Sequence, residues 1–266
     1  MNSLARGRGI YSLSYTSVQS KKFLAGLRFL CRRDAKCAEH SGQKPRAKGL
    51  LLQSPSMSRA RARKIKLLLF DVDGVMTDGK LCFFPATSHP SNTGSGAAPG
   101  APGNSPPEQK KLGWGTLHII ESKGFHAHDG TAISLARLGG LKTGLITRRM
   151  SETVAVRARD LRLDHAYQGI MVKIRAFEEI LGKEQITASE VAYVGDDVID
   201  LPIMRRCGFA VAVSNAREQV KQEAHWITSH AGGDGAIRDA VEYILKAQGR
   251  WDSAVKEYLE HGDAPS

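Results

Sequence analysis

The chain has 266 residues and a formal net charge of +11. Residues 1–64 hold 15 Lys and Arg against two acidic residues, and the remainder carries a net charge of −2. The positive charge therefore lies in an N-terminal extension, which argues against nucleic-acid binding by the folded part. The four cysteines are scattered, without a disulfide framework or zinc spacing, which fits a reducing compartment. No apolar run approaches the roughly 20 residues that span a bilayer, so no membrane partner is expected.

The first segment, residues 1–62, is rich in Arg, Lys and Ser and weakly patterned. We expect it to be a basic, disordered extension, or upstream sequence from a mis-assigned start, since Met57 would make a natural start for the folded part. The alternative is that residues 1–56 are a transit peptide. We accordingly expect a cytoplasmic protein, with an organelle as the alternative.

A phosphatase-sized domain is predicted over residues 63–256, followed by a C-terminal tail over 257–266. Its strands are continuous apolar runs, which indicates a sheet that is covered on both faces. Helical stretches alternate with these runs, a pattern typical of βαβ units. We therefore predict an α/β fold: a Rossmann-like, doubly wound, mostly parallel sheet. The expected strands are 65–70, 144–147, 191–194, 209–213 and 226–228, and the expected helices are 131–138, 151–162, 174–182, 216–224 and 235–247.

One segment interrupts this alternation. Residues 85–113 are dominated by Pro, Gly, Ser and Ala and cannot bury a core. Strand-like sequences flank them at 80–84 and 116–120. We expect a β-hairpin flap with a long loop at its tip, and no cap domain elsewhere in the chain.

Polar side chains follow the ends of three predicted strands. Asp71 and Asp73 follow the first strand, Thr147 the second and Asp196 the third, while Lys173 opens a helix. In a parallel sheet such side chains share the edge where ligands bind. One strand that ends in Asp is common as a turn or a helix cap. Three strand ends that converge with a lysine indicate a catalytic site.

These residue types suit hydrolysis of a phosphate monoester. Asp71 can attack phosphorus and form an acyl phosphate. A cation is needed between carboxylate and phosphate, and Mg²⁺ prefers oxygen ligands such as Asp71 and Asp196. Asp73 can protonate the leaving oxygen and later activate water. Thr147 offers a hydroxyl to a phosphoryl oxygen, and Lys173 offers a positive charge.

The neighbouring polar residues have less specific interpretations. Asp197 and Asp200 are expected to cap a helix or to support the site indirectly. His126 and His128 precede Asp129 and could contact substrate, but a metal role is not expected without further ligands nearby.

The sequence resembles the haloacid dehalogenase superfamily, and within it the capless 3-deoxy-D-manno-octulosonate 8-phosphate phosphatases. The resemblance covers about residues 65–256. It rests on Phe70-Asp-Val-Asp-Gly-Val, Leu145-Ile-Thr, Tyr167-Gln-Gly169 with Lys173, Gly195-Asp-Asp-Val-Ile-Asp200, Ala231-Gly-Gly and Leu245-Lys-Ala-Gln-Gly249.

This resemblance implies a homotetramer in which the hairpin aids assembly and a neighbouring subunit closes the site. It implies Asp71 as nucleophile, Asp73 as acid/base, and a Mg²⁺ site of Asp71, Asp196 and the backbone carbonyl of Asp73. The implied substrate is an octulosonate 8-phosphate of the lipopolysaccharide pathway. The substrate contacts that it implies are Asp73, Phe125, His126, Ala127, His128, Asp129, Arg149, Arg157 and Lys173.

Three positions depart from the family pattern. Arg148 replaces a glycine beside the phosphate site, His128 replaces a flap arginine, and Asp234 replaces another arginine. The last two changes weaken the case for an anionic sugar acid. Another sugar phosphate is therefore an alternative substrate. A catalytically silent oligomerisation module, like that attached to sialic-acid cytidylyltransferases, is a third possibility, although such a module has no need of Asp71 and Asp73.

Overall fold

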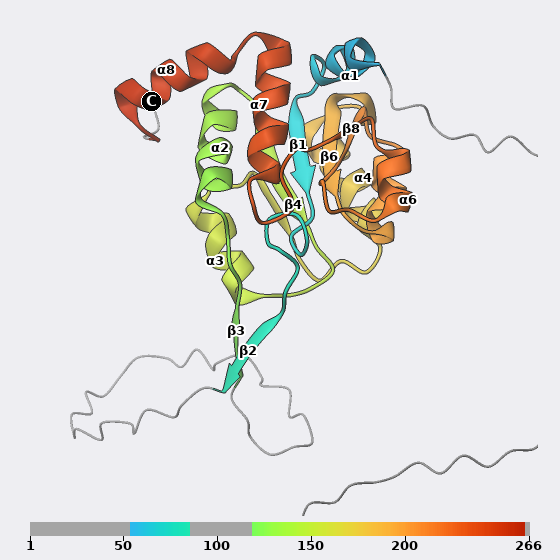
Figure 1. The fold of residues 1–266 in the computed structure, drawn as a ribbon, viewed down its shortest axis with the longest axis vertical. Helices are drawn as coiled ribbons and strands as arrows, with labels where there is room; N and C mark the ends of the chain where they lie inside the picture. The colour runs from blue at the N-terminus through green and yellow to red at the C-terminus, as the bar shows by residue number, and fades with distance from the viewer. Residues whose placement is uncertain (1–53, 86–118, 264–266) are drawn as a thin grey trace, which may run out of the picture. The chain divides into compact units, whose positions relative to one another are not determined.

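The computed structural model describes residues 54–85 and 119–263, and all of them fall within one compact unit of the chain, Lys48–Ser266 (Figure 1). The loop predicted over 85–113 and most of the extension predicted over 1–62 lie outside the described residues. None of the helices in the described ranges is long and apolar enough to cross a membrane.

The centre of the fold is a six-stranded sheet with the order β5-β4-β1-β6-β7-β8, in which every neighbouring pair is parallel. The predicted mostly parallel, doubly wound sheet is confirmed. Because β4 and β6 flank β1 on opposite sides, the strand order reverses at β1, which opens a crevice at the carboxyl ends of these strands. The strands are β1 (Leu67–Phe70), β4 (Lys142–Ile146), β5 (His165–Tyr167), β6 (Val191–Gly195), β7 (Phe209–Ala212) and β8 (Trp226–Ile227).

Helices cover both faces of the sheet, which explains why its central strands are apolar throughout. Helices α2 and α7 pack against each other on one face, with α3 beneath α2, and α4, α5 and α6 lie on the other (Figure 1). All four residues of β1 and all five of β6 are buried. The helices are α1 (Pro55–Ala62), α2 (Ala127–Leu138), α3 (Glu152–Asp160), α4 (Lys173–Glu184), α5 (Leu201–Met204), α6 (Glu218–Glu223), α7 (Ala236–Gln248) and α8 (Trp251–His261), with 3-10 turns at η1 (Ala188–Glu190) and η2 (Val198–Asp200).

Helix α7 shows how the sequence produces these layers. Ile237, Ala240, Val241 and Ile244 are fully buried and recur at the spacing of one helix face. Gly249 ends the helix with φ +70°, a left-handed conformation that suits glycine. The apolar face of α7 is thus buried in the core, where α7 packs beside α2 and against α1.

The predicted hairpin is present as a separate antiparallel pair, β2 (Cys82–Pro85) and β3 (Ile119–Ser122). Its large apolar side chains are more than half exposed: Phe83, Phe84, Ile119 and Ile120. No second domain of cap size occurs among the described residues.

Several boundaries differ from the prediction. Residues 55–62, predicted as part of the extension, form α1, which packs on α7. The buried groups of α1 are small, Ser58 and Ala62, so its sequence lacks an apolar stripe. Helix α8 reaches His261, inside the predicted tail, and β5 was not predicted because it has only three residues.

Candidate active site

The crevice at β1 collects the side chains that follow three strands. Asp71 follows β1, Thr147 follows β4, and Asp196 follows β6. The parallel register places Phe70 level with Leu145 and Val194, so the next residues along these strands meet at one edge. The predicted convergence is therefore found in the structure.

Lys173 lies beneath these carboxylates, where α4 begins. Its Nζ is 2.6 Å from Asp71 Oδ2 and 2.7 Å from Asp200 Oδ1, and its side chain is almost fully buried. A buried ammonium between two carboxylates offsets part of their repulsion and fixes their positions. Lys173 thus touches the predicted nucleophile directly.

Asp200 organises the region from below. Oδ1 accepts hydrogen bonds from Lys173 and from the Tyr193 hydroxyl, each at 2.7 Å. Oδ2 accepts from the backbone N–H groups of Asp196, at 3.1 Å, and Asp197, at 3.4 Å. Because both oxygens already have donors, Asp200 supports the loop after β6, as expected for an indirect role. Asp197 caps η2 through its own side chain, also as expected.

The carboxylates raise one another's pKa. Burial, and then the charge of Asp200, raises the pKa of Asp71 to about 6, although Lys173 lowers it. Burial, followed by Asp200 and Asp71, raises the pKa of Asp196 to about 7. Three carboxylates share one lysine, so the cluster attracts a further cation.

The cluster also fits a divalent ion by geometry. Ligand oxygens from Asp71, Asp196 and Asp200 lie within 4.8 Å of one another. Asp196 Oδ1 is buried without a hydrogen-bond partner among the described atoms. A side chain at Gly74 would come within 2.2 Å of Asp196 Oδ2, so the absence of a side chain there allows the carboxylate to reach the site. Hard oxygen donors of this kind suit Mg²⁺.

Asp73 lies at the rim and contacts two cations. Lys123 forms an ion pair with Asp73 Oδ1, and Arg149 Nε is 3.5 Å from Oδ2. Glu121 links the two cations, at 2.9 Å from Arg149 and 3.5 Å from Lys123. The Lys123 side chain is fully buried, although it is not among the predicted site residues. The sequence offered no signal for this contact, because it joins residues 50 positions apart.

A cavity of about 350 Å³ opens above these groups, and Arg148 and Arg149 lie at its edge. Its lining comprises Asp71, Asp73, Thr147, Arg148, Arg149, Met171, Asp196, Asp197 and Ile199. The Thr147 hydroxyl accepts a hydrogen bond from the Arg149 N–H at 3.4 Å. Anionic and cationic groups face one space, as a phosphate bound through a metal requires.

The predicted contacts at 125–129 do not line this cavity in the single chain. His126 precedes α2, and Asp129 is buried and accepts a hydrogen bond from the Arg238 N–H at 2.8 Å. Arg157, on α3, lies over the ring of Phe125 at 5.7 Å. Asp129 and Arg157 therefore have partners outside the cavity lining.

Comparison with known proteins shows the family of this chain. The sequence profile of the haloacid dehalogenase-like hydrolases matches residues 164–239. The 3-deoxy-D-manno-octulosonate 8-phosphate phosphatase of Escherichia coli (strain K12) is 34% identical over 195 residues, which cover 73% of this chain and 87% of the relative. The Yersinia pestis relative of the same name is 33% identical over 194 residues, or 73% and 87% of the two chains. This chain belongs to the haloacid dehalogenase-like hydrolases.

Solved structures agree with that membership. The Moraxella catarrhalis octulosonate 8-phosphate phosphatase, solved with magnesium, phosphate and the KDO molecule, aligns with TM-score 0.62 and 29% identity. The alignment covers 77% of this chain and 99% of that one. The Haemophilus influenzae enzyme, in a cobalt-bound form, aligns with TM-score 0.57 and 28% identity over 75% and 99% of the two chains. The predicted enzyme class, phosphoric monoester hydrolase, is confirmed at the level of the family, and the predicted Mg²⁺ agrees with the acidic cluster described above.

Proposed function

We propose that this hydrolase is a Mg²⁺-dependent phosphatase of a sugar-acid phosphate, with 3-deoxy-D-manno-octulosonate 8-phosphate as its substrate. The observation that carries the proposal is the contact between Asp71 and Lys173 beside the partnerless oxygen of Asp196. A nucleophile, its cationic support and a metal-ligand oxygen meet at one point. The family and the relatives' substrates support the same assignment.

In the proposed mechanism, a carboxylate oxygen of Asp71 attacks phosphorus and the bond to the leaving sugar oxygen breaks. The Asp73 carboxyl group gives its proton to that oxygen. Water then attacks the aspartyl phosphate while Asp73 takes the proton of that water, which releases phosphate and restores Asp71. Lys173 and the Thr147 hydroxyl stabilise charge on the phosphoryl oxygens.

Asp71 and Asp196, with the backbone carbonyl of Asp73, would hold Mg²⁺. The ion supplies Lewis-acid stabilisation of phosphoryl charge when bound. Arg149 is placed to orient Asp73, since its guanidinium lies 3.5 Å from that carboxylate.

The substrate assignment rests on the relatives and on the positive charge at the cavity edge. Arg148 and Arg149 both line the cavity and can attract a substrate carboxylate. His128 and Asp234 stand where the family has arginines, so another sugar phosphate is the alternative. A panel of sugar phosphates with Mg²⁺, read by released phosphate, separates the two. The octulosonate phosphate should have the largest kcat/KM, and preference for a neutral sugar phosphate would reject the assignment.

The covalent step has a direct test. Asp71→Asn removes the nucleophile and keeps the size of the side chain. Turnover should fall by at least about 10⁴-fold, the cost of losing a nucleophile that acts with its partners. Activity of the variant within a few-fold of wild type would reject the covalent mechanism. Such activity would also leave the silent-module alternative without support, because a silent module has no activity.

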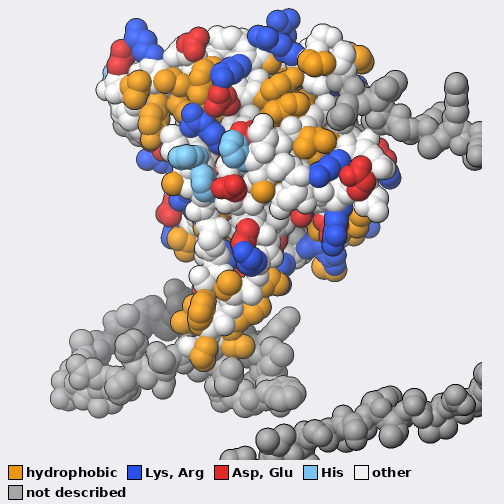
Figure 2. All heavy atoms as spheres, in the orientation of Figure 1, with side chains coloured by type: hydrophobic (Ala, Val, Ile, Leu, Met, Phe, Trp, Pro, Cys, Tyr) orange, Lys and Arg blue, Asp and Glu red, His pale blue; other side chains and the backbone are white. Residues whose placement is uncertain are grey.

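We propose also that the chain forms a homotetramer through its hairpin. Phe83, Phe84, Ile119 and Ile120 expose a contiguous apolar pair of strands, a surface that favours burial against another copy. Figure 2 shows these hydrophobic side chains gathered on the hairpin. Phe84→Ser with Ile120→Ser should lower the mass measured by analytical ultracentrifugation, whereas Val156→Ser, an exposed apolar change on α3, should not. An unchanged mass in the hairpin variant would reject the assembly surface.

The location remains a prediction. We propose a cytoplasmic enzyme with a domain over residues 63–256, to which α1 and α8 add at either end. Fractionation of cells that express the full chain would test whether residues 1–53 direct the protein to an organelle.

A further inference from the structure

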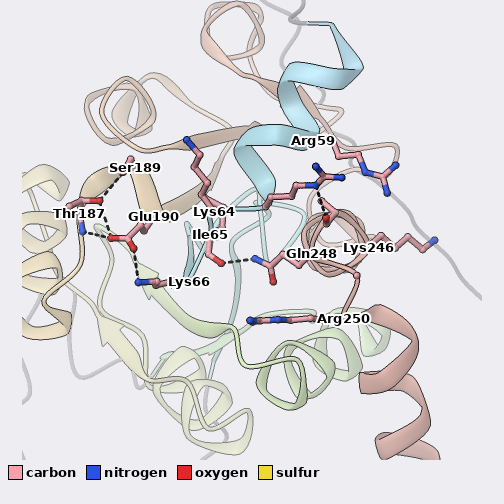
Figure 3. Close-up of a pocket in the computed structure, with 13 residues that line it drawn as sticks. Arg59, Lys64, Ile65, Lys66, Thr187, Ser189, Glu190, Lys246, Gln248 and Arg250 are labelled. Atoms are coloured by element: carbon pink, nitrogen blue, oxygen red, sulfur yellow. Dashed lines mark hydrogen bonds and ion pairs between the residues drawn. The ribbon is translucent and has the colours of Figure 1, made fainter.

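A wide cavity lined by described residues lies away from the catalytic cluster. It has a volume of about 1070 Å³ and is built by α1, the segment that leads into β1, the turn before β6 and the end of α7 (Figure 3). Lys66 immediately precedes β1 and Glu190 immediately precedes β6. The cavity therefore lies at the amino ends of the strands. The rise of an extended chain puts Lys66 about 16 Å from Asp71.

The lining of this cavity is strongly basic. Its one acidic side chain, Glu190, is already bonded to Lys66 at 2.6 Å and to the Thr187 backbone N–H at 2.9 Å. The cationic side chains outnumber it six to one: Arg59, Arg63, Lys64, Lys66, Lys246 and Arg250.

Part of this charge has structural partners, and part has none. Arg63 donates to the Ala247 carbonyl at the end of α7, and Arg250 donates to the Gly139 carbonyl at the end of α2. Such contacts stabilise helix carboxyl ends. Lys246 pairs with Glu242.

Arg59 and Lys64 differ, because neither side chain has a hydrogen bond or ion pair within the described ranges 54–85 and 119–263. The intervening Arg61 is turned to the Gly208 carbonyl at 3.0 Å. Cations that line one cavity repel one another, and an anion bound among them lowers that cost.

We propose that this cavity binds a small anion with two or more phosphate groups, at a site separate from the phosphatase centre. Arginine forks bind phosphate oxygens bidentately, and lysine adds a point charge. Cations on several walls of one cavity suit linked phosphates better than a single phosphate. The volume also suits a small ligand.

The adjoining cavity shows how a nucleotide could extend this ligand. It has a volume of about 440 Å³, shares Arg59 and Lys246 with the first, and adds Tyr243 and Trp251. Tyr243 stacks on Trp226 at 4.5 Å and Lys246 lies over Trp251 at 5.7 Å, so a base that stacked here would share these rings with them. Inorganic tripolyphosphate and ATP therefore share the recognised chemistry and differ only at this second cavity.

The test is calorimetric titration of the full chain with tripolyphosphate, ATP and orthophosphate in 0.15 M NaCl with EDTA. Chelation prevents turnover and keeps the phosphatase centre unfavourable for anions. The variant is Arg59→Gln with Lys64→Gln, and the control is Arg159→Gln with Arg175→Gln, which removes the same charge from exposed positions outside the cavity. Residues 1–53 are unchanged in both proteins, so a difference reports on the cavity.

Tripolyphosphate should bind at least about tenfold more weakly to the cavity variant than to wild type, as expected for two lost charge contacts. The control should bind as wild type does, orthophosphate should bind more weakly than tripolyphosphate, and the variant should keep its phosphatase activity and melting temperature. Tighter binding of ATP would add the aromatic cavity to the site. Equal loss in both variants, or no loss in either, would overturn the proposal.

Discussion

Replacing Lys173 by methionine tests how the catalytic cluster is held together. The change removes a buried ammonium that lies 2.6 Å from Asp71 and 2.7 Å from Asp200, and keeps the length of an apolar stem. Removing one partner from a buried ion pair costs about 3 to 5 kcal/mol, because the other charges stay buried. For a domain of this size that loss corresponds to a fall in melting temperature of about 6 to 20 °C.

The assay is thermal unfolding of the full chain in EDTA, with and without added Mg²⁺. The ion should restore part of the lost stability, because it supplies positive charge to the same carboxylates. The turnover number should fall about 10²- to 10³-fold, since Lys173 also faces developing phosphoryl charge. Lys183→Met, an exposed change on the same helix, is the control and should leave turnover unchanged. A melting temperature within 2 °C of wild type would refute the assignment of Lys173 as the charge that holds the cluster together.

Three further predictions concern other groups. Lys123→Met should lower kcat about 10- to 100-fold with little change in KM, because Asp73 loses its ion pair. Lys123→Arg should recover most of the lost kcat. Equal kcat in both variants would contradict this role of Lys123. Burial lowers the pKa of His225 from 6.5 to about 4, so it contributes stability that is complete above pH 6.5 and is lost as the pH falls toward 4. The free energy of unfolding, measured with urea, should fall between pH 7.5 and pH 5 by about 1 to 2 kcal/mol less in His225→Asn than in wild type. An equal fall in both proteins would count against a buried neutral ring. Removing divalent metal should stop hydrolysis and Mg²⁺ should restore it, whereas a rate insensitive to EDTA would exclude the metal.

The sequence predicted the elements whose signal is local. The apolar run before Asp71 required a buried strand, and polar residues after three such runs required a shared edge. Short or weakly apolar elements escaped. Strand β5 has three residues, and α1 buries only small side chains. Helix α8 was not predicted either, although Trp251, Ala254, Val255 and Tyr258 recur at helical spacing.

The sequence predicted which residue types form the site, but not which of these side chains contact one another. The hydrogen bond from Lys173 to Asp200 and the ion pair of Lys123 with Asp73 each join segments far apart in the chain. The sequence alone does not show that these segments meet. A lysine in a flap sequence has no feature that marks it as buried. The basic cavity is also a product of folding, since it joins α1 to the end of α7, residues separated by more than 180 positions.

The loop before α7 has a consequence for variation of this enzyme. Its backbone packs directly behind the turn that follows Asp71: a methyl group at Gly232 would lie 1.7 Å from the Gly74 carbonyl oxygen, and the Gly233 N–H donates to the Val75 carbonyl at 2.9 Å. Gly232 is not among the residues that line the catalytic cavity, yet even alanine there would push the nucleophile's turn out of place. A mutational scan should find this distant glycine as intolerant as the aspartates that it never contacts.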